Sequence, residues 1–409
     1  MKKKFIIIVL IFSLAASYVG MAQSTNILQQ NINERNTSET YGLQWEMEFG
    51  TDDRNCARYQ GPQPIGDADN DGKNELLISG RDAAVRVMKW NENTQTYEQD
   101  QALHTPFYPF IECDAGGMAI GDVTNDGKND IAATWYTTIY KYFAGRYWIA
   151  GFNPWIFFNQ GGSPDCLIGD CDNDGKNELI LSGGGGWNPN SPVGEIEVFR
   201  WNGLFLKRVA EWKDTAEPGY AYMAGLGDVN EDGNNEIVVA YSNKVMVLEW
   251  NTETKAFEGT EIYRSHDEWD SPFSIVCKDC DNDDKAEILV GFYAPHIMIF
   301  KWNGSDYETQ FDKTWPDGEP VIEGIDVGDT DDDGLNEVAA GVGVTYLLQW
   351  DGNTYIEEAT LPTYGWMAVV CIGDCDNDGK NEINCGNVDV PEGQPYMEWV
   401  FKYGWEPSN

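Results

Sequence analysis

Short apolar runs alternate with acidic loops along most of the chain. A run such as Met118-Ala119-Ile120 precedes a loop, and a run such as Leu179-Ile180-Leu181 follows a loop directly. Runs of this length suit β-strands, and strands that are apolar throughout are buried on both faces. The pattern therefore predicts a β-protein whose sheets pack face to face.

A third strand is marked by a tryptophan near its end. Val87-Met88-Lys89-Trp90-Asn91 recurs in similar form at residues 198–202, 247–251, 299–303 and 347–351. Three of these segments continue as Asn-Gly or Asp-Gly, which favours a tight hairpin into a fourth strand. Because the tryptophans keep a fixed register, we expect them to pack between sheets rather than to bind sugars.

The acidic loops recur seven times, and their spacing gives the size of the repeating unit. They begin 45 to 58 residues apart, at Asp67, Asp122, Asp170, Asp228, Asp279, Asp329 and Asp374. That period fits a unit of four strands, as in a propeller blade. We therefore predict an all-β fold, a seven-bladed β-propeller over residues 40–409. Each acidic loop should join the first and second strands of its blade.

The last unit is one strand short. Its third strand is predicted at residues 396–403, which leaves no room for a fourth before Asn409. Residues 43–49 alternate apolar and polar side chains as a strand does. We expect this N-terminal strand to complete the last blade and close the ring, because closure removes exposed sheet edges.

Each loop carries the pattern of a calcium ligand set. Positions 1, 3, 5 and 9 supply side-chain oxygens, position 7 supplies a backbone carbonyl, and a glycine at position 6 usually permits the sharp turn. Oxygen ligands with several carboxylates favour Ca²⁺ over zinc or copper. We predict up to seven structural calcium ions. The predicted ligands are Asp67, Asp69, Asp71, Lys73, Glu75, Asp122, Thr124, Asp126, Lys128, Asp130, Asp170, Asp172, Asp174, Lys176, Glu178, Asp228, Asn230, Asp232, Asn234, Glu236, Asp279, Asp281, Asp283, Lys285, Glu287, Asp329, Asp331, Asp333, Leu335, Glu337, Asp374, Asp376, Asp378, Lys380 and Glu382.

The seven sites should differ in strength. Thr124 and Asn230 each remove one negative charge, so loops two and four should bind calcium more weakly. Asp284 replaces the turn glycine of loop five at a conformational cost. We expect affinities on the order of 10⁻⁴–10⁻³ M, as in extracellular modules.

The loops, best seen as G-D-x-D-x-D-G-x-x-E at residues 169–178, resemble FG-GAP/VCBS repeats. Such repeats form the seven-bladed propeller of integrin alpha subunits and occur in many secreted bacterial proteins. The resemblance covers about residues 40–405 and implies calcium binding at the loop positions named above. It also implies a role in adhesion or binding, although propellers host many activities.

The N-terminus has the composition of a secretory signal. Residues 1–22 combine three lysines, an apolar segment too short to span a bilayer, and small residues before a cleavage site near Ala22. Residues 23–39 are polar and predict a flexible linker. We therefore expect a protein that is secreted, or held at the cell surface or in the periplasm. It should have no membrane span and be a monomer.

The charge of the chain limits its partners. The formal net charge is −41, which argues against nucleic acid, because phosphate binding needs a basic surface. So much negative charge in a folded chain is costly unless cations offset it. The acidic composition therefore agrees with bound calcium.

The nine cysteines allow several interpretations. The pairs Cys277/Cys280 and Cys371/Cys375 have a spacing that could suit zinc. Against zinc, three cysteines fall at the second position of an acidic loop, which should point away from an ion. Buried thiols, or a few disulfides, are the favoured interpretation.

The face opposite the acidic loops is the predicted ligand face. It should carry the remaining loops of the blades, which are rich in aromatic residues. Exposed, these rings would suit a sugar ring or a protein surface; the equal alternative is that many of them fill the gaps between blades. We predict a binding or adhesion module for a glycan or a protein. The aromatic candidates are Phe107, Tyr108, Phe110, Trp187, Tyr220, Tyr222, Trp269, Tyr293, Trp315 and Trp366.

An enzyme is the less favoured alternative. Some rhamnogalacturonan lyases are similar calcium-binding propellers, so a polysaccharide lyase or another carbohydrate-active enzyme is the form this alternative takes. A lyase needs a base to remove a proton and cations to neutralise a uronate. Arg264 and His266 are the closest pairing of a histidine with a basic residue. Since the sequence carries no nucleophile, phosphate or cofactor motif, we assign no catalytic or cofactor-binding residue.

Overall fold

The computed structural model describes residues 41–51, 61, 63–80, 84–106, 108–110, 116–134, 137–152, 165–184, 194–217, 219–267, 269–316 and 321–406. The predicted signal at residues 1–22, the predicted linker at 23–39, and the residues Cys56, Cys113, Phe107 and Trp187 lie outside these ranges. The described residues contain no helix, and hence none that could cross a membrane.

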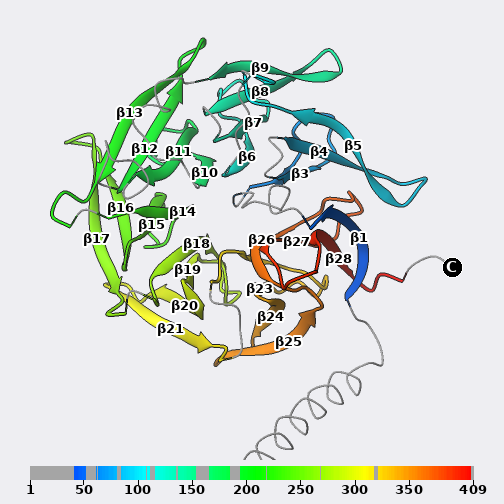
Figure 1. The fold of residues 1–409 in the computed structure, drawn as a ribbon. Coiled ribbons are helices and arrows are strands. Elements are labelled where there is room, and N and C mark those ends of the chain that lie inside the picture. The colour runs from blue at the N-terminus through cyan, green and yellow to red at the C-terminus, as the bar shows by residue number, and fades with distance from the viewer. Residues whose placement is uncertain are drawn as a thin grey trace, which may run out of the picture.

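Seven four-stranded antiparallel sheets are arranged in a ring (Figure 1). The first strands lie near the centre, and they are β2 (Ile65–Gly66), β6 (Met118–Gly121), β10 (Asp165–Gly169), β14 (Ala221–Gly227), β18 (Pro272–Lys278), β22 (Ile325–Gly328) and β26 (Trp366–Gly373). The second strands are β3 (Glu75–Ser79), β7 (Asp130–Ala133), β11 (Glu178–Gly184), β15 (Glu236–Tyr241), β19 (Glu287–Phe292), β23 (Glu337–Val342) and β27 (Glu382–Asp389). The predicted all-β, seven-bladed propeller is thereby confirmed.

The third and fourth strands extend each sheet outward. The third strands are β4 (Val85–Asn91), β8 (Thr138–Phe143), β12 (Gly194–Trp201), β16 (Lys244–Asn251), β20 (Ala294–Trp302), β24 (Val344–Trp350) and β28 (Tyr396–Tyr403). The fourth strands are β5 (Thr96–Leu103), β9 (Arg146–Phe152), β13 (Leu206–Lys213), β17 (Ala256–Arg264), β21 (Tyr307–Thr314), β25 (Tyr355–Leu361) and, at the outer edge of the last sheet, β1 (Tyr41–Gly50). Sheets one to six follow the order of β2 to β25, and sheet seven contains β26, β27, β28 and β1.

The second strands are apolar throughout because each sheet is packed between two others. In β3, Leu76 and Ile78 belong to a core cluster that includes Val400 of sheet seven. Leu77, between them, belongs to a cluster that includes Ile131 of sheet two. Alternate side chains of a strand point to opposite faces, so both faces of the sheet are core.

The tryptophans near the ends of the third strands are part of this packing. Trp90 lies opposite Tyr97 across the hairpin, with ring centroids 4.9 Å apart. Trp250–Phe257 and Trp350–Tyr355 repeat the pairing at the same distance. Because these rings pack against core clusters, the structural interpretation of the tryptophans is confirmed.

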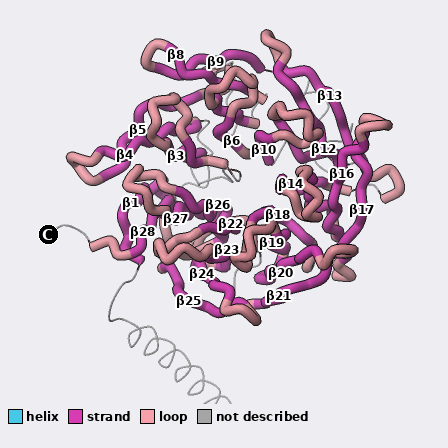
Figure 2. Tube along the Cα trace, turned by 180° about the vertical axis from the view of Figure 1, so that it is seen from behind, coloured by secondary structure: helices cyan, strands magenta, loops and turns pink. Residues whose placement is uncertain are grey.

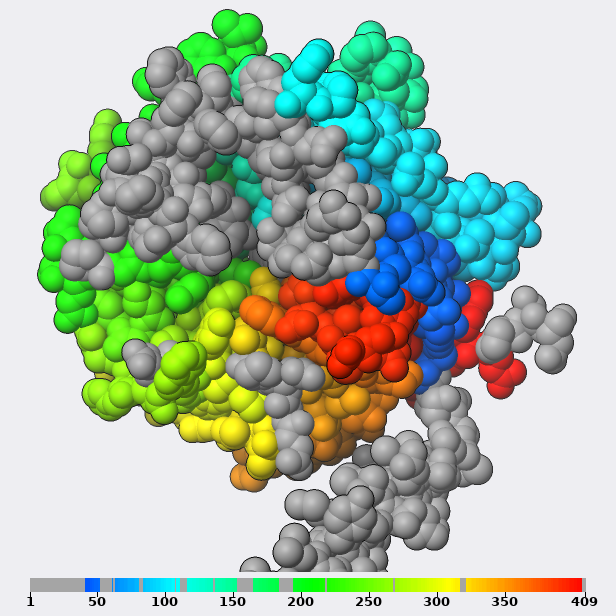
Figure 3. Space-filling view, viewed as in Figure 1, coloured from blue at the N-terminus to red at the C-terminus, as the bar shows by residue number. Residues whose placement is uncertain are grey.

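Strand β1 pairs antiparallel with β28, from opposite ends of the chain, with Tyr41 opposite Tyr403. Figure 3 shows the first described strand, in blue, directly beside the last strands, in red. Phe49 of β1 is buried in a cluster shared with β3 and β28, and Trp45 packs against that cluster. Strand β1 therefore contacts sheet one as well as sheet seven.

The described cysteines are buried thiols. All seven are free, and all except the half-buried Cys277 are fully buried. Burial raises the pKa of every one of them, which keeps the thiols neutral. These residues therefore pack as small apolar side chains.

Candidate functional site

Each acidic loop joins the first and second strands of its sheet and folds around its own carboxylates. In loop one, Asp67 accepts the backbone N–H groups of Asp71 and Gly72 at 2.9 and 3.0 Å. The Asp71 carboxylate accepts the N–H of Lys73 at 2.9 Å. Loops two, three, four and seven repeat these three bonds in the same positions.

Position 9 of each loop is a buried acid that starts the second strand. Glu75 is fully buried, and its Oε2 accepts the N–H groups of Ala68 and Asp69 at 2.8 and 3.2 Å. Burial raises the pKa of Glu75 to about 7, and that of Glu236, in loop four, to about 8. A buried carboxylate is costly unless a cation is close to it.

In five loops that cation is a side chain of the third strand. It is the residue directly before the aromatic near the strand end, and it contacts loop positions 3, 5 and 9. Lys402 Nζ lies 2.9 Å from Asp378 and 2.7 Å from Glu382, and it also contacts Asp376. The others are Lys89, Lys141, Arg200 and Lys301.

Loops four and six have no such base. Glu249 stands at this position in β16, and Gln349 stands there in β24. The Gln349 amide donates to Asp333 and Glu337 at 3.3 and 3.1 Å. The sequence analysis did not identify this position. The pattern is nevertheless present in the sequence, because the position directly precedes each marked tryptophan or the tyrosine that replaces it.

The loops are also tied to one another around the ring. Position 4 has a left-handed backbone in all seven loops, with φ between 56° and 67°, a conformation that asparagine tolerates well. Asn70 of loop one exchanges two bonds with the backbone of Asn129 in loop two, at 2.8 and 3.0 Å. Asn377 of loop seven makes the same exchange with Asn74 of loop one, which joins the last sheet to the first.

Two of the seven junctions use ion pairs instead. Glu231 of loop four pairs with Lys285 of loop five, and Asp332 of loop six pairs with Lys380 of loop seven. Figure 2 views the ring from behind, where its connecting loops surround the centre. We call the asparagine exchanges and the ion pairs between neighbouring acidic loops the loop belt.

Asn377→Ala should destabilise the chain by about 2–3 kcal/mol. It removes two hydrogen bonds of about 1 kcal/mol each and places alanine in a left-handed backbone, at a cost of about 1 kcal/mol. Asn377→Gly should avoid the cost of the left-handed backbone but still lose the two hydrogen bonds. Asn353→Ala, in an exposed hairpin turn, should not change the stability. Urea unfolding measures all three, and an Asn377→Ala chain as stable as the Asn353→Ala chain would show that the belt is not structural.

The loop carboxylates fit a hard cation. In loop one, ligand atoms of Asp67, Asp69 and Asp71 lie within 4.8 Å of one another, and loops three, five and six contain similar groups. Buried oxygens without a hydrogen-bond partner occur at position 3 or 9 of loops one, two, three, five and seven, and at Glu358 beside loop six. All-oxygen sets of this kind suit calcium, which would be held by the side chains at positions 1, 3, 5 and 9 and would cross-link the loop.

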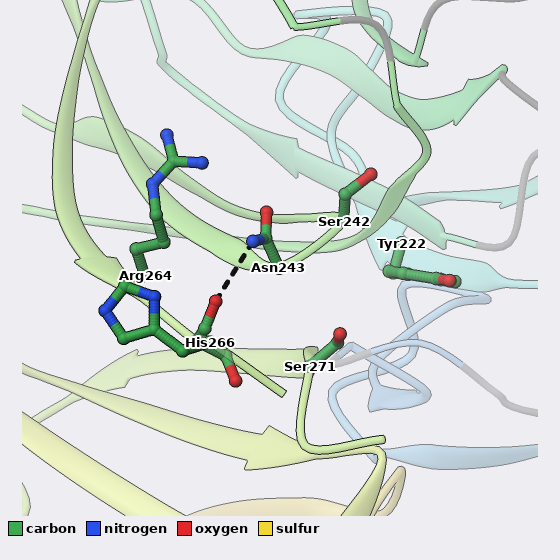
Figure 4. A pocket seen from close by; sticks show the side chains of 7 residues that line it. Tyr222, Ser242, Asn243, Arg264, His266 and Ser271 are labelled. Carbon is green, nitrogen blue, oxygen red and sulfur yellow. Dashed lines mark hydrogen bonds between the residues drawn. The ribbon is translucent and has the colours of Figure 1, made fainter. Parts of the chain in front are cut away.

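The opposite face carries a polar pocket of about 560 Å³. It lies where the β15–β16 hairpin of sheet four meets the segment that leads to sheet five. Figure 4 shows its lining, with the Tyr222 ring on one side and His266 on the other. The lining residues are Tyr222, Ser242, Asn243, Arg264, Ser265, His266 and Ser271.

An aromatic row continues from this pocket across the face. Tyr222 lies 4.7 Å from Tyr220 and 4.9 Å from Phe273, measured between ring centroids. Phe273 is 5.7 Å from Tyr293, which is 6.5 Å from Trp366 of sheet seven. These five rings, all partly exposed, form what we call the aromatic row.

The row contains four of the predicted ligand-face aromatics, and three others are exposed outside it. Phe110 is 93% exposed and Trp269 is 69% exposed, while Tyr108 stacks on His104. The prediction for Trp315 is wrong. That side chain is buried against Tyr346 and belongs to a core cluster, since the segment after β21 folds back over sheet six.

Two family models match parts of the chain. Residues 67–133, which contain loops one and two, match the FG-GAP-like repeat. Residues 188–359 match the KICSTOR complex protein kaptin. The chain is a seven-bladed propeller with an FG-GAP-like match over its first two acidic loops. No curated protein sequence matches it significantly.

Solved structures similar to this propeller agree on the fold. The crystal structure of BBS1N in complex with ARL6DN is 12% identical, with a TM-score of 0.60, and the match covers 91% of this chain and 99% of that one. The Dos1 propeller is 8% identical, with a TM-score of 0.50, over 80% of this chain and 75% of that one. At such identity, the likeness concerns the fold alone.

Two basic side chains of the propeller, Arg264 and His296, are engaged with acids. The Arg264 guanidinium pairs with Glu217 and Glu261. His296 is buried and lies between Asp270 and Asp312, at 2.9 and 3.0 Å. Arg264 and His266, the closest pairing of a histidine with a basic residue in the sequence, both line the pocket.

Proposed function

We propose that this propeller is an exported, calcium-stabilised and non-catalytic binding module that recognises a protein partner through the aromatic row. The observation that carries the proposal is the row itself, together with the pocket that continues it at Tyr222. Partly exposed aromatic rings supply rigid contact area at low entropic cost, and they are enriched in protein interfaces. The acidic loops, by contrast, are engaged with one another and with third-strand bases.

The comparisons favour a protein as the partner. The similar BBS1N structure is that of a complex with ARL6DN, and kaptin is named as a protein of the KICSTOR complex. We assign the partner contact to the face opposite the acidic loops, because the aromatic row and the pocket lie there. A secreted or cell-surface location follows from the predicted signal at residues 1–22.

Catalysis is the less favoured role for this face. A lyase would need a cation to neutralise a uronate and a base to remove a proton. Arg264 in the pocket is already neutralised by Glu217 and Glu261. The three serines and one asparagine of the lining are suited to hydroxyl groups, so a non-catalytic glycan contact is the second candidate.

The proposal is tested with an array of extracellular proteins and glycans, probed with the chain lacking residues 1–22. We expect binding to a protein that falls at least tenfold in the variant Tyr222→Ala/Tyr293→Ala. Phe143→Ala removes an exposed ring from the hairpin β8–β9, on the acidic-loop face, and should leave binding unchanged. Binding that depends on Phe143, or binding to glycans alone, would contradict the proposal.

Acidic polysaccharides provide the separate test of catalysis. We expect no increase in the ultraviolet absorbance of unsaturated products when they are incubated with the chain and calcium. Product formation would show that the lyase alternative is correct.

A further inference from the structure

The acidic loops fall into two classes when their third-strand partners are compared. Five loops contain the ammonium or guanidinium group described above, which contacts the acids at positions 5 and 9 directly. A divalent ion would need these same carboxylates, and two cations a few ångströms apart repel each other strongly in a partly buried site. In these five loops, the side-chain cation therefore takes the place of a metal.

In loop six, the third strand supplies no positive charge and the fourth strand adds a negative one. Gln349 replaces the base, and the fourth strand adds a further carboxylate, Glu358, beside Asp331. The Glu358 Oε2 atom is buried, and the group that Glu358 contacts is the Asp331 carboxyl. Unpaired buried oxygens also occur in loops one, two, three, five and seven, but there a lysine or arginine lies beside the acid. Two carboxyl groups in contact, with no base beside them, leave a place that a cation satisfies.

Sheet five provides a matched comparison. Gln310 occupies the same bulge of the fourth strand as Glu358 does, and its amide donates to Asp281 of loop five. Lys301 contacts the same Asp281 carboxylate. The third and fourth strands of sheet five thus both supply hydrogen-bond donors to loop five. The same strands of sheet six supply loop six with one amide and one additional acid.

Loop four resembles loop six more weakly. Glu249 stands where five other sheets have a base, so the third strand adds a negative charge rather than a positive one. Position 3 of this loop is the neutral Asn230. Loop four therefore lacks an internal cation but offers a divalent ion fewer charged ligands.

We propose that loop six binds a divalent cation of the calcium class, that loop four binds one more weakly, and that the other five loops are neutralised by their own lysine or arginine and take up no metal. This refines the calcium part of the proposed function and reduces the expected number of ions from seven to two. It does not depend on the identity of the partner.

The experiment is a titration of the metal-free chain from residue 23 with Ca²⁺ by calorimetry, and with Tb³⁺ by luminescence sensitised through Trp350, next to Gln349. We expect no more than two ions per chain. Gln349→Lys should abolish the tighter site, and Lys301→Gln should create one additional site at loop five. Lys207→Gln, at an exposed position of β13, serves as the matched control and should change nothing.

The outcomes are distinct for each variant. Binding of one or two ions per chain, with the tighter site lost in Gln349→Lys, supports the proposal. Binding of one additional ion by Lys301→Gln supports it as well. Three or more ions in the unaltered chain, or no ion at all, would overturn it. Since no partner is present in the titration, its failure would leave the partner-binding proposal untouched.

Discussion

A chain that begins at Thr51 should lose cooperative folding. Without β1, the backbone of β28 becomes an exposed edge, and such edges pair with other chains. The deletion also removes the Phe49 and Trp45 side chains from the cluster shared by sheets seven and one, and truncating one large core aromatic costs about 3–5 kcal/mol. Losses of this size exceed a large part of the stability of a typical domain.

Thermal unfolding and light scattering measure this effect. We expect the chain from Thr51 to aggregate and to show no sharp transition. The matched control begins at Thr40, keeps β1 and should unfold at the same temperature as the longer chain from residue 23. A sharp transition of the shorter chain at that temperature would show that sheet seven does not need β1.

The second large effect is expected for Lys402→Gln, measured in the presence of a strong chelator. Burial alone would lower the pKa of Lys402, but the contacts with Asp376, Glu382 and Asp378 outweigh burial and raise it. The substitution leaves these acids without a cation, and removing one partner from a buried ion pair costs about 3–5 kcal/mol. Urea unfolding should show a loss of this size.

Calcium should reverse much of the loss in Lys402→Gln, because the variant loop seven then resembles the natural loop six. Lys207→Gln removes an exposed lysine of β13, and it should change the free energy of unfolding by less than about 0.5 kcal/mol. If Lys402→Gln behaves like that control in chelator, the third-strand bases do not stabilise the loops.

The architecture could be predicted because its signals are local and repeated. The spacing of the loops from Asp67 to Asp374 fixes the number of sheets, and the apolar runs after each loop place the second strands. Each of these features depends on residues within one repeat. The number of sheets and the positions of their second strands can therefore be predicted without knowing how the sheets pack.

The features that escaped prediction depend on contacts between distant segments. Lys402 stands 20 residues after Glu382 in the sequence, and a lysine in a strand is usually solvated. Only the pairing of β27 with β28 brings it over loop seven. Four residues of the aromatic row were predicted one by one, but their arrangement as a row was not, since Tyr222, Tyr293 and Trp366 come from three different sheets.

Trp315 shows the reverse error for a related reason. Its place after a fourth strand predicted a loop side chain on the ligand face, but a loop residue can pack onto the neighbouring sheet. The ring stacks on Tyr346 of sheet six, 5.1 Å away. Sequence position therefore assigns a residue to a face of the propeller but does not determine its exposure.

The central claim is that the acidic loops are a scaffold in which five loops are held by their own bases and two require a metal. Hydrogen–deuterium exchange of the chain from residue 23, with calcium and with chelator, resolves each loop separately. We expect calcium to slow amide exchange in residues 228–236 and 329–337 and to leave the other five loops unchanged. Slower exchange in all seven loops, or in none, would contradict the claim.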